Sequence, residues 1–378
     1  MAKAERGLGL NSAENISMKP NYCRGLHDLP ESWLKWSGEQ NENIFNTFEY
    51  LTVCEKMLPS HRKARFMRLE AAGELIGMAP LTVERELGWQ RLRPLMSGNS
   101  DHEAPVFSPH PEKAVQCLLR ALQGDRQWDC FSIWNLPDDD PHYKPLLEAD
   151  GWDRVIEEGQ PIPRLDLSAG FEAVWEKVAK SIRLDSDRCK RKLENLGEVR
   201  FHNFASLPET LEGMETLFNL HIRRWRLLGG RSMFEIPAKR EFLKALAVAL
   251  QGAGTLDFSE LCLADRTVAI HFGFVCQKRL LYYVPTFDPE FSRFSPGRLL
   301  LINLIRSACE RGLREFDFLV GEEKYKLDWP VQIIQSYNFY FYNQTLRAKV
   351  AKAWHHGLKP VLAPVYRKTR KAWLRLGI

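Results

Sequence analysis

Apolar and polar positions in the last third of the chain alternate in a way that predicts a strand, a helix and a strand in succession. Residues 280–287 (LLYYVPTF) form a β-rich run that ends at an Asp-Pro turn. Apolar side chains then recur so densely between 299 and 308 that they predict a helix buried on more than one side, with Ser295 as its N-cap. Residues 315–321 (EFDFLVG) form the next strand, and 333–343 (IIQSYNFYFYN) a third, alternating one. Elements of these lengths predict a βαβ unit with parallel strands.

A similar order of elements appears in the first half of the chain. The Phe-Ser-Pro triplet before the helix occurs again at 107–109, where a periodic helix at 111–124 and a strand at 128–136 follow it. Each half also has a β-hairpin pattern upstream, at 66–84 and at 259–276. We therefore predict an internal duplication of one α/β unit.

Two helical patterns separate the halves. Residues 171–197 have helical periodicity and end at Gly197, and residues 206–230 begin at Ser206, a suitable cap. They are expected to open the second unit.

The composition agrees with a folded protein of two domains. The chain has 378 residues, of which 44% are hydrophobic and 27% charged. Residues 1–20 lack the apolar stretch of a signal peptide, and no window has the roughly 18 apolar residues that a membrane span needs. The eight cysteines lie at least 13 residues apart without metal-binding spacing. These features predict a soluble, cytoplasmic protein with reduced thiols.

The net charge of +5 is concentrated at the C-terminal end. Residues 346–378 contain nine of the 53 Lys and Arg residues and no acid, interleaved with Val and Trp. Such a basic amphipathic segment is typical of contact with an anionic membrane surface or a partner protein. A helix docked on the body with a solvated basic face is an equal alternative, and RNA binding is a third.

Several short motifs, taken in order, resemble a known family. They are SGNSDH (97–102), HIRRW (221–225), YY (282–283), FDP (287–289), SPG (295–297) with the leucines after it, and the run from Asp317 through Gly321 to Tyr325, Lys326 and Trp329. The chain resembles the GCN5-related N-acetyltransferases (GNAT), in particular their duplicated, CelD-like branch associated with cellulose and exopolysaccharide biosynthesis. The Fem-type aminoacyltransferases look like a more distant relation.

The resemblance implies a mixed α/β fold of two tandem GNAT-like domains. We expect a flexible N-terminus at 1–20, a first domain at 21–168, a second domain with the acyl-donor site at 169–345, and a basic helical extension at 346–378.

The resemblance also implies how an acyl-CoA would bind. In such folds the pantetheine lies between two diverging strands, and the start of the following helix faces the pyrophosphate, because its free N–H groups favour an anion. Here Ser295, Gly297, Arg298 and Leu299 occupy that helix start. Phe294 and Leu299 depart from the usual Gln/Arg-x-x-Gly-x-Gly/Ala loop, which leaves a longer acyl-CoA or an aminoacyl-tRNA open as the donor. The alternative without a ligand is that Ser-Pro-Gly only caps the helix.

Acyl transfer needs a proton acceptor and a well-placed thioester, but no covalent nucleophile. Asp317, which interrupts a Phe-Asp-Phe strand, is the first candidate for the base. Lys326 and Glu322 follow at the carboxyl end of that strand, where ligands gather in open α/β sheets. Tyr283 could assist the leaving thiolate. A strand-end ion pair, a solvated loop and core packing are the corresponding structural alternatives.

The candidate substrate-binding residues are Asp101 and His102 in the first half, and Arg224, Trp225 and Tyr325 in the second. Asp101 and His102 could orient an acceptor between the halves, although the same residues are common in turns. His355-His356 has no other ligands nearby in the sequence, so no metal is expected.

These features predict a CoA-dependent acyltransferase acting on an amine or hydroxyl of a cell-envelope or exopolysaccharide precursor, with acetyl-CoA or another acyl-CoA as co-substrate and no tightly bound cofactor. The expected place is the cytoplasm or the inner face of the membrane, reached through the basic tail or a polysaccharide synthase partner. An aminoacyl-tRNA-dependent transferase and a non-catalytic accessory subunit of polysaccharide synthesis are the alternatives.

Overall fold

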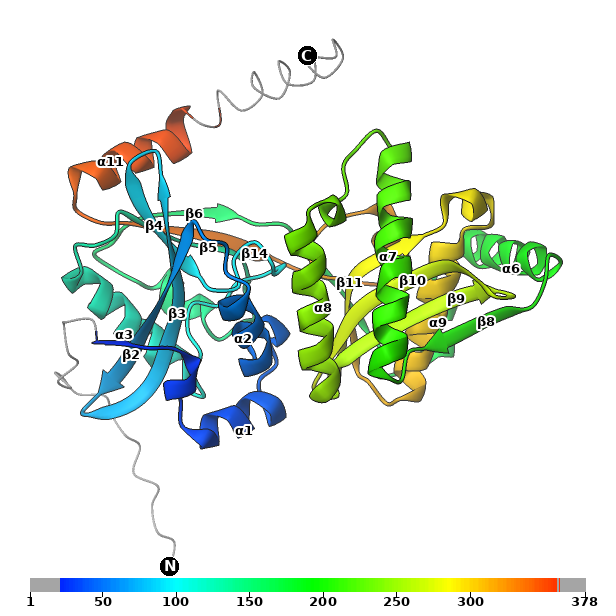
Figure 1. The fold of residues 1–378 in the computed structure, drawn as a ribbon, viewed down its shortest axis with the longest axis horizontal. Helices are drawn as coiled ribbons and strands as arrows, with labels where there is room; N and C mark the ends of the chain where they lie inside the picture. Colours follow the sequence, from blue (N-terminus) through cyan, green and yellow to red (C-terminus); the bar gives the residue numbers. More distant parts are fainter. Residues whose placement is uncertain (1–20, 359, 361–378) are drawn as a thin grey trace, which may run out of the picture.

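The computed structural model describes residues 21–358 and residue 360, which form two seven-stranded sheets covered by helices (Figure 1). Neighbours in the first sheet are, in order, β1 (Asn21–Cys23), β2 (Arg62–Ala71), β3 (Glu74–Glu86), β4 (Trp89–Pro94), β5 (Cys130–Pro137), β14 (Ser336–Tyr342) and β6 (Asp153–Glu158). In the second they are β8 (Val199–Asn203), β9 (Leu256–Leu263), β10 (Arg266–Cys276), β11 (Arg279–Phe287), β12 (Glu315–Asp317), β7 (Ile162–Asp166) and β13 (Gln332–Ile334).

Helices cover both faces of each sheet. The first sheet carries α1 (Glu31–Glu39), α2 (Phe48–Lys56), α3 (Pro111–Gly124) and α4 (Tyr143–Leu147). The second carries α5 (Phe171–Lys177), α6 (Lys180–Glu194), α7 (Leu207–Leu227), α8 (Pro237–Gly252), α9 (Pro296–Glu310) and the short α10 (Lys324–Leu327). In Figure 1, α7 and α8 lie on one face of the second sheet, and α9 lies on the other. No described helix is both long and apolar enough to cross a lipid bilayer.

The two sheets repeat one strand order, which confirms the predicted mixed α/β fold with two similar units. In each, an antiparallel hairpin leads into a strand that pairs in parallel with the strand after a crossover helix. These parallel pairs are β4 with β5 across α3, and β11 with β12 across α9.

The units exchange one strand each. Strand β7 comes from the first half of the chain but lies in the second sheet, between β12 and β13, where Leu165 is buried. Strand β14 comes from the second half and lies between β5 and β6, where Phe339 and Phe341 are buried. The predicted domains at 21–168 and 169–345 therefore each contribute one strand to the sheet of the other domain. A single boundary in the sequence does not separate the two sheets.

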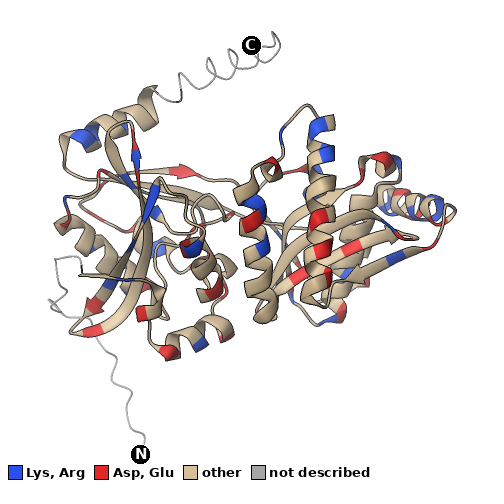
Figure 2. Cartoon of the chain, viewed as in Figure 1, with Lys and Arg blue, Asp and Glu red and all other residues tan. Residues whose placement is uncertain are grey.

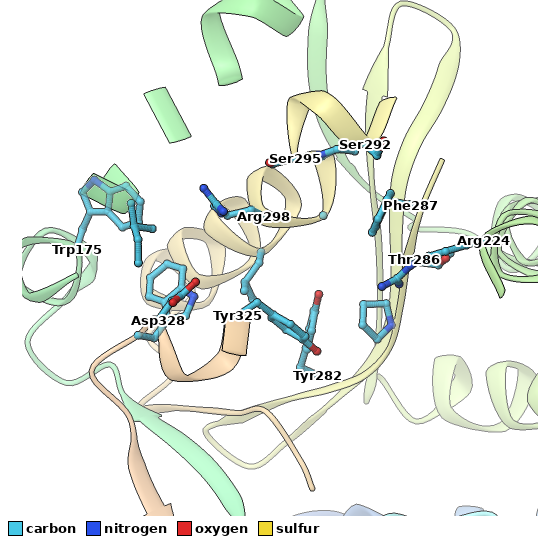
Figure 3. A pocket seen from close by; sticks show the side chains of 16 residues that line it. Trp175, Arg224, Tyr282, Thr286, Phe287, Ser292, Ser295, Arg298, Tyr325 and Asp328 are labelled. Carbon is cyan, nitrogen blue, oxygen red and sulfur yellow. The ribbon is translucent and has the colours of Figure 1, made fainter. Parts of the chain in front are cut away.

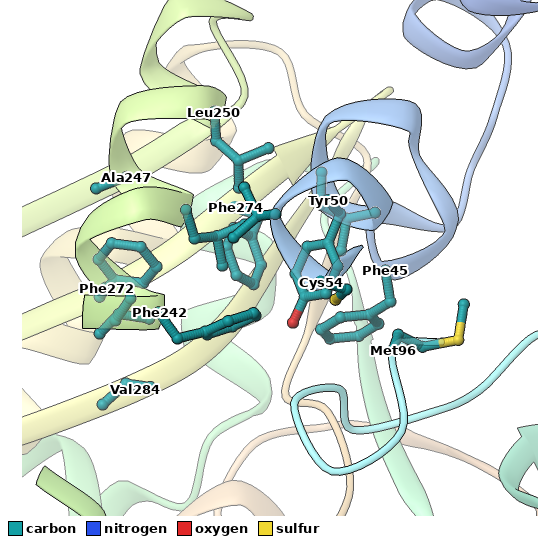
Figure 4. Packing of buried hydrophobic residues seen from close by; sticks show 14 of the residues in the cluster. Phe45, Tyr50, Cys54, Met96, Phe242, Ala247, Leu250, Phe272, Phe274 and Val284 are labelled. Carbon is teal, nitrogen blue, oxygen red and sulfur yellow. The ribbon is translucent and has the colours of Figure 1, made fainter. Parts of the chain in front are cut away.

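The halves also share a hydrophobic core. One cluster joins Phe45, Tyr50 and Cys54 of the first half to Phe242 and Phe274 of the second (Figure 4). The rings of Phe45 and Tyr50 lie 6.1 and 6.3 Å from that of Phe274. Because this interface buries aromatic side chains as a domain core does, we expect the halves to unfold together.

The helices between the halves differ in part from expectation. The segment 171–197 is two helices rather than one, because Val178 and Ala179 are extended and Val178 turns into the core. Helix α7 begins as predicted: Ser206 accepts the N–H of Glu209, and the Glu209 carboxylate accepts the Ser206 N–H, which completes a capping box. No helix was predicted from the sequence at Pro237–Gly252, where α8 lies.

The first part of the basic segment packs on the first sheet. Helix α11 (Leu346–Ala353) and the π-helical turn Trp354–Leu358 follow β14, and Ala348 and Ala351 are fully buried. Arg347 lies 3.5 Å from Asp129. Docking on the body therefore holds for residues 346–358. The predicted flexible N-terminus at 1–20 and residues 361–378 lie outside the described residues. On the described part, basic and acidic residues are mixed over most elements (Figure 2).

Candidate acyl-donor site

Strands β11 and β12 diverge after three paired residues. Their parallel register runs from Arg279 opposite Glu315 to Leu281 opposite Asp317, where β12 ends. Strand β11 continues to Phe287, so its last residues have no strand partner on that side. A pocket of about 260 Å³ opens at this point (Figure 3).

The pocket combines an apolar wall with a few polar groups. The wall is formed by the side chains of Trp175, Ile182, Pro285, Phe287, Leu301 and Trp329. The polar groups come from four elements, α7, β11, α9 and α10, and include Arg224, Thr286, Ser295, Arg298, Tyr325 and Asp328 (Figure 3). Mostly apolar lining with a small number of oriented polar groups is typical of small-molecule sites.

The start of α9 forms one end of the pocket. Ser295 is left-handed, with φ 50° and ψ 47°, and makes no side-chain cap, so its hydroxyl does not act as the N-cap predicted from the sequence. The N–H groups of Arg298 and Leu299 bond the Ser295 carbonyl oxygen, and Pro296 has no N–H. Among the described residues, that leaves the Gly297 N–H as the free donor of this helix start.

Gly297 is required by close packing. A Cβ at this position would lie 3.2 Å from the Phe287 ring, which is tighter than ordinary van der Waals contact. A larger side chain would therefore displace Phe287 or fill the pocket.

Two arginines place positive charge beside the helix start. Arg298 bonds Asp185 of α6 through Nη1 at 2.8 Å. The Arg224 guanidinium lies 4.4 Å from the centre of the Phe287 ring, and burial lowers the pKa of Arg224. Because both arginines line the same pocket as Gly297, this end of the pocket suits an anion.

Three of the four predicted donor-binding residues line the pocket. Ser295, Gly297 and Arg298 line the pocket, whereas Leu299 does not. Leu299 is 5% exposed and packs in the core between α9 and the sheet. Although it was predicted among the donor-binding residues, Leu299 therefore does not contribute to the pocket.

Asp317 does not suit the role of base expected from the sequence. It is fully buried, and one carboxylate oxygen accepts from Arg164 Nε at 3.1 Å while the other accepts the Leu319 N–H at 2.7 Å. Its side chain is absent from the pocket lining. Asp317 instead ties β12 to β7, the exchanged strand that carries Arg164.

Lys326 and Tyr325 are neighbours in the segment after β12, but their side chains make different contacts. Lys326 is 4% exposed, donates to the Val320 carbonyl oxygen at 2.8 Å and lies 2.9 Å from Glu323. Tyr325 lines the pocket, and Glu322 is exposed. Lys326 thus holds the loop, and Tyr325 is the loop residue that faces a ligand.

The SGNSDHE loop of the first half reaches the second half. Tyr283 donates its hydroxyl to the Asn99 carbonyl oxygen at 2.8 Å, and Lys239 donates to that of Gly98 at 2.7 Å. Tyr283 is thereby committed to this contact rather than free beside a thiolate. The loop also carries Asp101, which interacts electrostatically with Lys326 and, like Asp317, does not line the donor pocket.

Asp101 has the most distinctive electrostatics of the predicted residues. Burial raises the pKa of Asp101 to about 7, with Lys326 opposing and Asp317 adding to the shift. A carboxylate with this pKa is half ionised at neutral pH and can accept a proton efficiently.

The other predicted substrate residues lie apart. His102 is buried and lines a different pocket, between the halves. The Trp225 indole donates to His221 Nε2 at 3.1 Å, and Trp225 is 42% exposed outside the donor pocket.

The first half has no equivalent opening between β4 and β5. Glu103 fills it: its backbone N–H donates to the Trp134 carbonyl oxygen at 3.1 Å, and its carboxylate accepts the Trp134 N–H at 3.0 Å. Arg93 pairs with Glu103 at 3.2 Å. Residues 104–107 are part of this loop and make a single bridge, from Phe107 to Met78.

Sequence reasoning did not select Trp175, Thr286 or Asp185 for this site. Trp175 lies on a helix predicted only for its period, and Asp185 lies within a mixed charge run. Their roles depend on the break between α5 and α6, which turns both residues toward α9.

Comparison with known proteins agrees with this geometry. Residues 180–327 match the family model of the acetyltransferase (GNAT) domain. Among curated proteins none matches the chain.

Three solved structures share the fold over most of their length. FemX has a TM-score of 0.60 at 10% identity, covering 86% of this chain and 98% of its own. A conserved protein of unknown function from Bacteroides thetaiotaomicron has a TM-score of 0.54 at 11% identity, covering 86% and 100%. L-PGS from Bacillus licheniformis has a TM-score of 0.52 at 11% identity, covering 84% and 93%. Residues 180–327, which are similar to the GNAT domain, include most of the residues that line the α9 pocket.

Proposed function

We propose that this protein transfers an acyl group from acyl-CoA, bound in the α9 pocket, to an amine or hydroxyl acceptor. The observation that carries the proposal is the coincidence of three features: the opening between β11 and β12, the free Gly297 N–H, and the two arginines beside it. A GNAT domain implies an acyl-CoA co-substrate, and these residues fit one. Arg298, Arg224 and the helix start would hold the pyrophosphate, and the apolar wall would hold the pantetheine.

Asp101 is the proposed base. The acceptor's lone pair forms a bond to the thioester carbonyl carbon, the C–S bond breaks, and CoA leaves as a thiolate. The acceptor proton passes to the Asp101 carboxylate. This role requires the first half, because Asp101 lies on its SGNSDHE loop.

The acceptor class follows from the family resemblance alone. An exopolysaccharide or cell-envelope precursor, met at the inner membrane surface or beside a synthase, remains part of the proposal. The acyl length is left open, and the binding measurement below decides it.

Thermal unfolding of the full chain against CoA, acetyl-CoA and longer acyl-CoAs tests the donor site. A ligand at 100 times its dissociation constant stabilises the folded state by about 2.7 kcal/mol. We expect a rise in the midpoint for CoA and a larger rise for one acyl length. No rise with any of them would contradict the proposal and favour a non-catalytic accessory subunit.

A further inference from the structure

A second pocket, of about 390 Å³, lies between the halves, beside the start of α3. The pocket is lined by Pro109 and Pro111 at the start of α3 and by Pro137 at the end of β5. The donor pocket is lined by the equivalent places in the second half, the start of α9 and the residues after β12. Trp36 at the end of α1 forms a further wall, and Arg164 and Arg279 extend the pocket to the second half.

Apart from Glu42, which is exposed at the pocket, the acidic and arginine side chains that line it are already paired. The pairs are Asp139 with Arg164, Asp140 with His142, and Arg279 with Glu315. The helix start also lacks the glycine and arginine of α9, since α3 begins with His110 and Pro111. Paired charges and a helix start of this kind do not suit a pyrophosphate.

The hydrogen-bonding groups left over are neutral and buried. Neither ring nitrogen of His102 has a hydrogen-bond partner among the described residues, and His102 is 4% exposed. Asn43 Nδ2 and Asn46 Oδ1 are likewise unpaired. The other polar atom of each side chain is bonded: Asn43 Oδ1 accepts the Phe45 N–H, and Asn46 Nδ2 donates to the Val106 carbonyl oxygen. Burial lowers the pKa of His102 to about 4, so the ring is neutral at pH 7 and offers one donor and one acceptor.

Unsatisfied buried polar groups are costly, and native proteins rarely keep several in one place without a ligand or water. Here a donor, an acceptor and an imidazole that can do both gather in one pocket beside the Trp36 ring. A ligand that satisfies them has many hydroxyl or amide groups and no net charge.

We propose that this pocket binds an uncharged saccharide unit through His102, Asn43 and Asn46. Arg164, which lines the pocket, also bonds Asp317 at the end of β12, so one side chain connects the pocket to a donor strand. Its identity as the acceptor rests on the proposed function, whereas its binding does not.

The test is binding of neutral disaccharides to the full chain. Cellobiose, maltose and N,N′-diacetylchitobiose are titrated at millimolar concentration by saturation-transfer NMR and calorimetry, with glucuronate as the anionic comparison. We expect at least one neutral disaccharide to bind and to bind more tightly than glucuronate.

Substitution of His102 separates a ligand contact from a structural role. His102→Phe keeps the edge-on contact with Phe45, whose ring centre is 4.8 Å away, and removes the two unpaired nitrogens. We expect at least a tenfold loss of saccharide affinity without a fall in the unfolding temperature. Asn43→Asp keeps the acceptor for the Phe45 N–H, removes the free donor, and should also weaken binding. Arg298→Gln serves as the matched control, with unchanged saccharide affinity.

Three results would overturn the inference: no neutral disaccharide binds the wild type, glucuronate binds more tightly, or both pocket variants bind as the wild type does. The outcomes of the two proposals are separable. Saccharide binding without acyl-CoA binding defeats only the proposed transferase function, and acyl-CoA binding without saccharide binding defeats only this inference.

Discussion

Replacing Arg298 by Gln should weaken CoA binding mainly through the pyrophosphate. The Arg298 side chain is 31% exposed, and its guanidinium bonds Asp185 at 2.8 Å. A hydrogen bond to a charged group contributes about 1.5–3 kcal/mol, which corresponds to a roughly 10- to 150-fold change in dissociation constant. Because the side chain is partly solvated, we expect a loss near the lower end, about tenfold.

The substitution has a second effect through Asp185. Hydrogen bonding to Arg298 lowers the pKa of Asp185, so this carboxylate is ionised at neutral pH. Without Arg298, its negative charge faces the same end of the pocket and opposes the pyrophosphate. The double variant Arg298→Gln/Asp185→Asn should therefore recover part of the loss, and Asp185→Asn alone should bind CoA a few-fold more tightly.

Calorimetric titration with CoA and with pantetheine separates these contributions. Pantetheine lacks the pyrophosphate, so its affinity should be the same in the wild type and in all three variants. Equal losses for CoA and pantetheine would show that Arg298 acts through the fold. Unchanged CoA affinity in Arg298→Gln would refute the assignment of the helix start as the phosphate site.

Four further outcomes are expected. In the wild type, kcat/KM should rise with pH through about 7 and then level off, because ionised Asp101 accepts the proton; Asp101→Asn should abolish the rise. Because its pKa is raised in the folded state, Asp101 loses stabilisation as pH rises toward 7, so Asp101→Asn should increase the unfolding temperature more at pH 8 than at pH 5, measured calorimetrically. Phe339→Ala, in the strand exchanged into the first sheet, should cost about 3–5 kcal/mol in urea unfolding and leave a single transition; two separate transitions would contradict a shared core. Deleting residues 346–378 should lower the unfolding temperature, because Ala348 and Ala351 are buried; deleting only 361–378 keeps these contacts and is the variant with which to test membrane co-sedimentation.

Much of the fold could be predicted because its signals are local. The hairpins, the crossover helices and the cap at Ser206 depend on short-range periodicity and turn chemistry, and each is present in the structure. The exchange of β7 and β14 could not be predicted, because each strand would satisfy the same alternating pattern in either sheet. Pairing partners far apart in sequence leave no trace in a single strand's periodicity.

The same difference between local signals and long-range contacts applies to the residues of the site. That Ser295, Gly297 and Arg298 lie together could be predicted because a helix start has a recognisable sequence. The pairing of Asp317 with Arg164 could not be predicted because it depends on the exchanged strand β7, and the raised pKa of Asp101 could not because it depends on burial in the folded chain.

Hydrogen–deuterium exchange of the full chain with and without saturating CoA tests the central claim most directly. The account predicts slower exchange at the start of α9 and around residues 325–329, with no change at the start of α3. Protection at α3, or no protection in the second half, would contradict the assignment of the donor site.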